Sequence, residues 1–168
     1  YGLRAFASNF DEEGIKEAVS YCHNHNVKTY ITLNILAHNE DFNGLIEYLK
    51  FLEECKIDGV IVSDLGIASY VKKYTNIPLH VSTQANITNV ESAKLWVSLG
   101  AERLVLAREL SLKEIRQIKD AVGDNIEIET FVHGAMCVSY SGRCLLSNYL
   151  TNRDSNKGEC AQPCRWDY

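Results

Sequence analysis

The C-terminal part of the sequence gathers the residue type best suited to chemistry. Four of the six cysteines follow one another there at the spacing Cys137-x6-Cys144-x15-Cys160-x3-Cys164. Thiolates are soft ligands that select zinc, copper(I) or iron–sulfur clusters, and a Cys-x3-Cys pair can bind one centre while two more ligands arrive from a distance. The spacing favours a metal centre over a pair of disulfides or a set of inert buried thiols, because nothing else in the chain argues for an oxidising compartment.

The rest of the chain alternates two periodicities, which indicates the scaffold that must position these cysteines. Apolar residues recur at helical spacing in five stretches, and the last of these opens with the capping box Ser111-x-x-Glu114. Between the helices lie short runs of β-branched and aliphatic residues, at 27–33, 59–63, 79–83, 103–107 and 126–132. Such near-continuous apolar runs predict parallel strands that are buried on both faces.

Successive β/α units of this kind predict an α/β fold. The chain contains neither a Gly-x-Gly-x-x-Gly turn nor a Walker loop, so the units favour a TIM-type (β/α)8 barrel over an open nucleotide-binding sheet. Five strands cannot close that barrel, so we expect an incomplete segment whose sheet edges are covered by further residues or by a second chain. We expect residues 1–133 to form the barrel segment and residues 134–168, the cysteine segment, to continue the same domain.

Polar residues follow several of the predicted strands. In barrels of this type the chemistry gathers at the C-terminal ends of the strands. Gln84, Arg108, Glu129 and His133 lie at such ends and not where helix caps are needed, so we assign them to function. The polar residues that precede helices, such as Asp64, fit capping equally well. Because the cysteine segment leaves the fifth strand at this same end, we expect its metal centre at the mouth of the barrel.

The cysteine segment and the strand before it resemble a known family. The matching residues are Glu129, Phe131, Gly134, Ala135, Met136, Cys137, Gly142, Cys144, Leu146 and Ser147, and they fit the signature of peptidase family U32, the collagenase-like proteases. The continuation, Asn152-Arg153-Asp154 and Gly158-Glu159-Cys160-Ala161-Gln162-Pro163-Cys164-Arg165-Trp166, is similar to that of bacterial members that support tRNA uridine hydroxylation. Upstream matches, such as Arg4-Ala5-Phe6, extend the likeness over essentially the whole chain. The resemblance implies a barrel whose first unit and last part lie outside this segment.

The resemblance also implies a cofactor. Family members that hydroxylate tRNA uridines, ribosomal RNA or ubiquinone precursors without oxygen carry a [4Fe–4S] cluster on cysteines of this segment. Carried over residue by residue, the ligands are Cys137, Cys144 and Cys160. The fourth is either Cys164 or a residue beyond Tyr168, since some members take their last ligand from further downstream.

For the reaction, the resemblance implies hydroxylation of tRNA uridine to 5-hydroxyuridine, with prephenate as the source of the hydroxyl oxygen. The carboxylates of such a donor would suit Arg108 or Arg143 as bidentate partners. Glu129 and His133 are expected to position groups or transfer protons, and Arg108 completes the predicted catalytic set. The predicted substrate-binding residues are Gln84, Arg143, Arg153 and Arg165.

Two other function classes remain open at this point. A peptidase, as the family name implies, needs a nucleophile or a metal-bound water, and the nearest arrangement is His133 four residues before Cys137. That pair would leave the other three cysteines of the segment without a reason. The second alternative is a structural zinc module that only fixes the C-terminal loop.

Charge and hydropathy limit the partners and the compartment. The formal net charge of −5 argues against broad electrostatic capture of nucleic acid. From Cys137 onward, however, basic residues exceed acidic ones by one. No run of apolar residues is long enough to span a membrane, and no signal-peptide pattern opens the sequence, so we expect a reduced, cytoplasmic setting. Cys22 and Cys55, which fall on or near apolar helix faces, are predicted to be small core residues.

Overall fold

The computed structural model describes residues 9–134, 136–140 and 143–167 of the chain. The helices are α1 (Glu12–Asn24), α2 (Leu45–Glu54), α3 (Leu65–Tyr74), α4 (Val90–Ser98), α5 (Leu112–Val122) and α6 (Leu146–Thr151). The strands are β1 (Tyr30–Leu33), β2 (Gly59–Val62), β3 (Leu79–Val81), β4 (Ala101–Val105) and β5 (Glu127–Glu129). The predicted motif Arg4-Ala5-Phe6, together with Ala135 and Gly142, lies outside the described residues.

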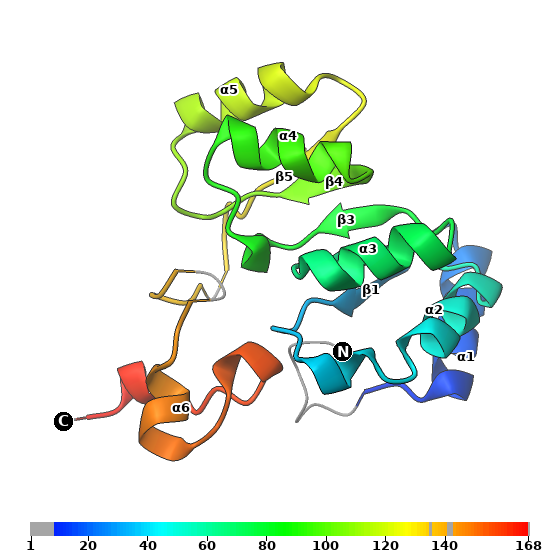
Figure 1. The fold of residues 1–168 in the computed structure, drawn as a ribbon, viewed down its shortest axis with the longest axis horizontal. Helices are drawn as coiled ribbons and strands as arrows, with labels where there is room; N and C mark the ends of the chain where they lie inside the picture. The colour runs from blue at the N-terminus through cyan, green and yellow to red at the C-terminus, as the bar shows by residue number, and fades with distance from the viewer. Residues whose placement is uncertain (1–8, 135, 141–142, 168) are drawn as a thin grey trace.

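The strands form one parallel sheet in the order β1-β2-β3-β4-β5, with a helix between each pair of strands (Figure 1). Crossovers between neighbouring parallel strands are right-handed, so a sequential strand order places every connecting helix on the same face of the sheet. This is the arrangement of successive units in a (β/α)8 barrel, as the alternating periodicities predicted.

The core lies between the sheet and its helices. Leu33, Val62, Val81 and Leu104 of the sheet are fully buried there. Aliphatic residues of α2, α3 and α5 pack with them, and α4 contributes Ala93 and Trp96. The opposite face carries a row of cross-strand neighbours with polar members, namely Thr32, Ile61, His80, Arg103 and Glu127. The prediction that all strands are buried on both faces is therefore wrong for β1 and β5. These are the edge strands, in which Thr32 and Glu127 are exposed.

Side-chain caps fix where the helices begin. Asp64 accepts a hydrogen bond from the Ile67 N–H at 3.0 Å and so caps α3, which confirms the capping interpretation of this residue. Ser111 and Glu114 form the predicted capping box at the start of α5. Four of the strands are shorter than the apolar runs suggested: β1 begins later than its run, β2 and β3 end earlier, and β5 does both. The fourth strand, β4, has the predicted length but begins two residues earlier, at Ala101.

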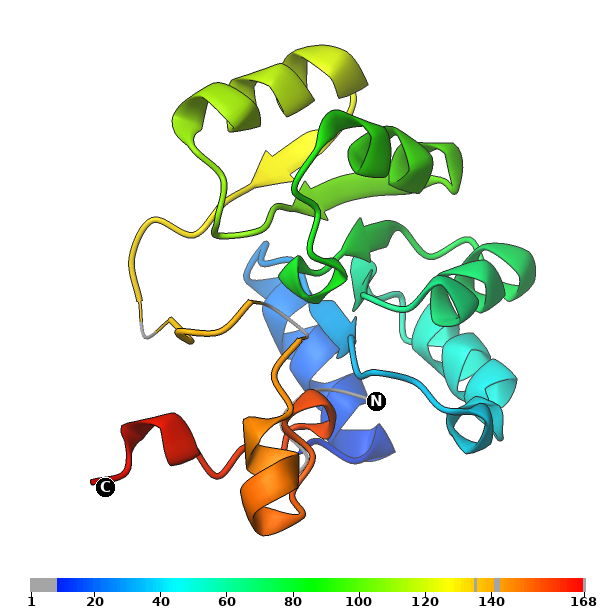
Figure 2. The same ribbon diagram turned by 60° about the vertical axis from the view of Figure 1, so that its left-hand side comes forward.

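Beyond β5 the chain leaves the sheet. The cysteine segment contains α6 and two short 3-10 helices, η3 (Ser155–Lys157) and η4 (Pro163–Arg165). Figure 2 shows this part, in orange and red, standing off the sheet and away from helices α2 to α5. Among the described helices, none is long and apolar enough to cross a membrane.

Candidate functional site

The cysteine segment is bonded to loops at the edge where the strands end. In the loop after β1, the Leu36 N–H donates to the Asn156 carbonyl at 3.1 Å. Lys157 forms an ion pair of 3.4 Å with Asp41 of the same loop. A hydrogen bond from the His38 N–H, with a smaller contribution from Lys157, lowers the pKa of the Asp41 carboxyl. The segment therefore lies at the end of the sheet where we expected it.

Arg108, which follows β4, makes a second attachment. Its guanidinium donates from Nη1 to the Cys137 carbonyl at 2.6 Å and from Nη2 to the Ser139 carbonyl at 2.9 Å. The planar guanidinium suits two parallel hydrogen bonds of this kind. The structure thus gives Arg108 the task of positioning the backbone at the first cysteine of the segment.

Cys144 is held through its own carbonyl oxygen. That oxygen accepts hydrogen bonds from Ser155 Oγ at 2.7 Å and from Asn156 Nδ2 at 3.3 Å. Asn156 is buried, and its backbone carbonyl also binds Leu36. This one asparagine therefore connects Cys144 to the loop after β1. Sequence reasoning did not single it out, although it lies in the polar turn Asp154-Ser155-Asn156 between two cysteines.

Cys160 lies beside α6. The adjacent Ala161 N–H donates to the hydroxyl of Ser147 at 3.0 Å, and Ser147 is completely buried. The Gln162 N–H in turn donates to Cys160 Sγ at 3.3 Å. Amide hydrogen bonds to sulfur are among the interactions that tune iron–sulfur clusters. Cys164 belongs to η4, and its side chain is exposed.

The donor set fits a cluster in its chemistry, because all six cysteines are free thiols and the four of the segment are exposed or half-buried. Within the described ranges, however, no group of three His, Cys, Asp or Glu side chains is arranged to hold a metal ion. The structure anchors Cys137, Cys144 and Cys160 individually and does not bring them to one point. Their assignment as ligands stays a prediction. Cys22 and Cys55, predicted as core residues, are half-buried, and Cys55 packs against the core.

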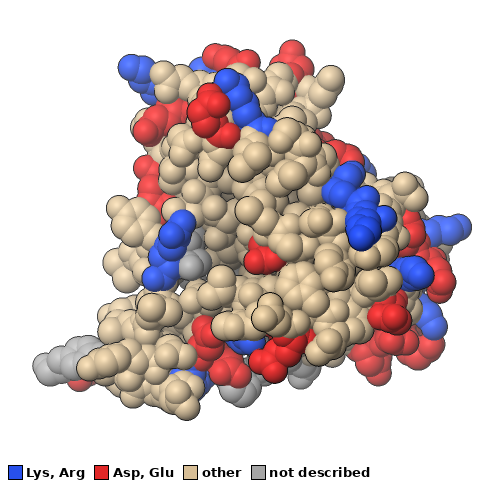
Figure 3. Space-filling view, in the orientation of Figure 1, with Lys and Arg blue, Asp and Glu red and all other residues tan. Residues whose placement is uncertain are grey.

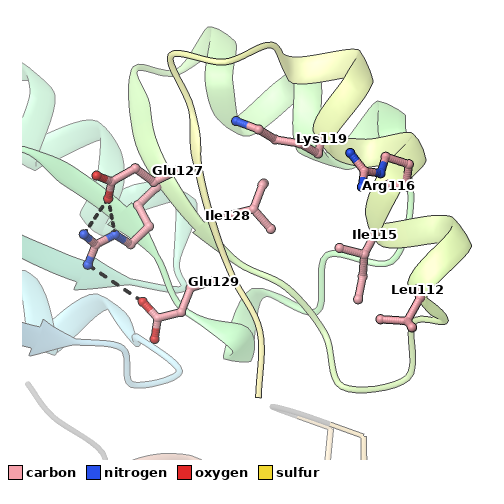
Figure 4. A pocket seen from close by; sticks show the side chains of 8 residues that line it. Leu112, Ile115, Arg116, Lys119, Glu127, Ile128 and Glu129 are labelled. Carbon is pink, nitrogen blue, oxygen red and sulfur yellow. Dashed lines mark hydrogen bonds and ion pairs between the residues drawn. The ribbon is translucent and has the colours of Figure 1, made fainter. Parts of the chain in front are cut away.

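Glu129 and His133 are not brought together. Glu129 ends β5 as an exposed residue, 3.8 Å from Nη1 of Arg103, as Figure 4 shows. His133 is exposed in the following loop. In the part of the chain that the structure describes, no hydrogen bond or ion pair joins these two residues, and none joins His133 to Cys137.

Figure 4 also shows the wide groove beside Glu129, of about 880 Å³. It runs along β5 and α5, between the apolar side chains of Leu112, Ile115 and Ile128 and the charged group formed by Arg103 and Glu127. The groove marks the open edge of the sheet and does not lie at the strand ends. Because of this position, we do not choose the groove as the candidate site, although it is large.

A smaller cavity does lie at the strand ends. It has a volume of about 70 Å³ and is lined by Asn34, Ile35, Leu36, Ser63, Asp64, Gln84 and Asn156. Gln84, predicted from the sequence to bind substrate, thus lies in a cavity that Asn156 of the cysteine segment also lines. The other predicted binding residues, Arg143, Arg153 and Arg165, are exposed on the cysteine segment.

Surface charge is mixed. On the face shown in Figure 3, lysine and arginine side chains are scattered among aspartates and glutamates and do not form a continuous basic field. Any contact with a polyanion on this face must therefore be local.

Comparisons with known proteins agree with this architecture. A model of peptidase family U32 matches residues 1–168. A relative from Bacillus subtilis (strain 168), "tRNA hydroxylation protein P1", is 48% identical over 100% of this chain and 40% of its own length. The "23S rRNA 5-hydroxycytidine C2501 synthase" of Escherichia coli (strain K12) is 39% identical over 100% of this chain and 25% of its own length. The chain therefore spans less than half the length of these curated relatives.

A solved structure, that of the U32 peptidase Mk0906, has a TM-score of 0.65 at 17% identity and covers 77% of this chain and 55% of that chain. At this identity the likeness concerns the fold alone. The family match, by contrast, extends over the whole sequence, from residue 1 to residue 168. The chain belongs to peptidase family U32.

Proposed function

We propose that this chain is the part of an enzyme that hydroxylates a pyrimidine base of RNA, with tRNA uridine as the substrate and 5-hydroxyuridine as the product. The observation that carries the proposal is the attachment of the cysteine segment, through Arg108 and Asn156, to the strand ends beside a polar cavity. Relatives named for tRNA hydroxylation and for 5-hydroxycytidine synthesis in rRNA support the reaction type.

In this proposal Cys137, Cys144, Cys160 and Cys164 hold a [4Fe–4S] cluster. When bound, such a cluster supplies one-electron chemistry, which suits a hydroxylation that does not use oxygen. Arg108 fixes the backbone carbonyls at Cys137 and Ser139, so it holds the first ligand in place.

The hydroxyl oxygen comes from a carboxylate-bearing donor, which we propose to be prephenate. Arg143 is exposed on the cysteine segment and supplies a guanidinium for a bidentate contact with a carboxylate. Two N–H groups of Arg108 already bind backbone carbonyls, so we assign the anion to Arg143. Glu129, the last residue of β5, and His133, in the loop that follows, supply side chains for proton transfer once substrate is bound.

Peptidase activity is the second candidate, and the specific observation in its favour is the family name, shared by the solved relative of similar fold. A cysteine peptidase needs a thiolate activated by a neighbouring base. His133 and Cys137 would be that pair, yet both are exposed and, among the described residues, no hydrogen bond joins them. The described arrangement therefore does not support this pair as a catalytic dyad, and we rank peptidase activity second.

The test is a strain that lacks the full-length protein. Its tRNA is digested to nucleosides and analysed by mass spectrometry, and 5-hydroxyuridine derivatives at the wobble position are expected to disappear and to return on complementation. An unchanged nucleoside profile would remove the proposed reaction. Cleavage of gelatin by cluster-free protein, lost in Cys137→Ser, would establish the peptidase instead.

A further inference from the structure

The small cavity at the ends of β1, β2 and β3 has a specific hydrogen-bonding character. At about 70 Å³ it has room for a few water molecules or for the edge of a planar ring. Three of the donor groups in its lining are already bonded within the protein. Asn34 Nδ2 donates to Ser82 Oγ at 3.2 Å, Ser63 Oγ to the Ile35 carbonyl at 3.3 Å, and Asn156 Nδ2 to the Cys144 carbonyl.

Two hydrogen-bond acceptors in the lining, by contrast, have no partner in the part of the chain that the structure describes. The side-chain oxygens of Asn34 and Gln84 are buried and have no hydrogen-bond partner within the described protein. In the structure Asn34 Nδ2 donates to Ser82 Oγ, and Oδ1 is the end of that amide without a partner among the described residues. A carboxylate, Asp64, also lines the cavity. An occupant that brings N–H or O–H groups can pair with these two oxygens, and the Asp64 carboxylate disfavours an anion such as a phosphate or carboxylate.

The neighbourhood of the cavity narrows the choice of occupant. Asn156 lines it and also binds the carbonyl of Cys144, so the cavity adjoins the cysteine segment directly. In a pyrimidine, the Watson–Crick edge carries the N–H donor, and the C5–C6 edge lies on the other side of the ring. A base whose Watson–Crick edge enters the cavity keeps C5, the carbon hydroxylated in the proposed reaction, outside and open to the segment.

We propose that the cavity is the subsite that reads the N–H group of the substrate pyrimidine, with the side-chain oxygens of Asn34 and Gln84 as acceptors. The donor is the N3–H of uracil or the amino group of cytosine. This inference rests on the proposed RNA hydroxylation. An unstacked base held by its Watson–Crick edge is the usual way in which a protein presents a base for chemistry.

The test measures binding by the full-length protein, independently of turnover. Fluorescent purine oligoribonucleotides carry one uridine, one 3-methyluridine, one cytidine or one N4,N4-dimethylcytidine, and affinity is read by anisotropy. Methylation removes the N–H donor and leaves the ring. Wild-type protein should bind one unmethylated probe about 10-fold more tightly than its methylated partner. The pair that shows the difference identifies the base.

Gln84→Met keeps the size of the side chain and removes the acceptor, so the discrimination should fall toward 1-fold. Gln117→Met, at an exposed position of α5, is the matched control and should retain it. Thermal unfolding of each variant establishes that it folds. Equal affinities of wild type for both members of each pair, or an undiminished ratio in Gln84→Met, would overturn the subsite and leave RNA binding intact. If no pyrimidine probe binds wild type better than an all-purine oligonucleotide, the proposed function itself fails.

Discussion

The guanidinium of Arg108 donates a hydrogen bond from Nη1 to the backbone carbonyl oxygen of Cys137, at 2.6 Å. These residues are 29 positions apart, so the contact joins the end of β4 to the loop beyond β5. Arg108 was predicted from the sequence to be catalytic. In the structure it orients the backbone of Cys137, a predicted cluster ligand. The consequence can be tested separately from the reaction.

Replacing Arg108 by lysine should loosen the loop at residues 136–140. Lysine keeps the charge but cannot make two parallel hydrogen bonds. We expect a local cost of about 1 kcal/mol at this partly exposed contact, and hence about 5-fold faster amide hydrogen exchange in the loop. Arg116→Lys, at an exposed position of α5, is the control and should change nothing in this loop. Unchanged exchange in Arg108→Lys would mean that the contact does not hold the segment.

The cysteines predict a graded result in iron analysis. In full-length protein purified without oxygen, Cys137→Ala, Cys144→Ala and Cys160→Ala should each lose the iron and acid-labile sulfide of a [4Fe–4S] cluster, about four of each per chain. Cys22→Ala and Cys55→Ala should retain both, because these half-buried residues, on α1 and at the C-terminal cap of α2, do not belong to the cysteine segment. Iron retained in any of the first three variants would contradict the ligand set. Zinc without sulfide in wild type would favour the structural zinc module.

The exposed arginines of the cysteine segment predict the salt dependence of RNA binding. Because the surrounding surface is of mixed charge, each arginine that contacts a phosphate should account for a definite part of the slope of log affinity against log salt. Arg143→Ala and Arg153→Ala should each reduce that slope by about 0.7–0.9 without loss of iron. Arg116→Ala on α5 is the control. Slopes unchanged in both variants would place the RNA elsewhere.

Features set by neighbours along the chain could be predicted from the sequence. The capping box at Ser111 and Glu114, the order of helices and strands, and the parallel sheet all follow from local patterns. The exposure of β1 and β5 could not be predicted in the same way, because an apolar run does not reveal whether its strand lies at an edge. Thr32 and Glu127 are exposed because their strands lie at the two edges of the sheet.

The candidate site shows the same division. The type and spacing of the cysteines indicated the chemistry, and their place at the strand ends followed from the order of elements. The roles of Arg108 and Asn156 depend on partners brought close only by folding. The environment of His80 could not be predicted either, because a lone histidine in a sequence usually lies in solvent or has a hydrogen-bond partner. Here it is 5% exposed, and its Nδ1 has no hydrogen-bond partner in the described protein.

His80 predicts a loss of stability in mild acid. Its ring packs against Tyr30, with centroids 4.9 Å apart. Burial, reinforced by the positive charge of Arg103, lowers the pKa of His80 from 6.5 to about 4, whereas Glu127 and Lys28 act on it in opposite directions and more weakly. Between these two pKa values the unfolded chain binds more protons than the folded one. Stability is therefore complete above pH 6.5 and falls as the pH drops toward 4, by about 2–3 kcal/mol.

The measurement is the free energy of unfolding in urea at pH 7.5 and pH 5. His80→Phe keeps a ring against Tyr30 and removes the titrating group, so its stability should change less between the two pH values than that of wild type. His25→Ala, at an exposed position after α1, should behave as wild type. Arg103 lowers the pKa of Glu127. Burial raises the pKa of Asp58, but hydrogen bonds from Thr29 and His23 outweigh this effect and lower it. Neither carboxyl group therefore accounts for a change in stability between pH 7.5 and pH 5. Equal pH dependence in wild type and His80→Phe would show that His80 takes up its proton without cost to the fold.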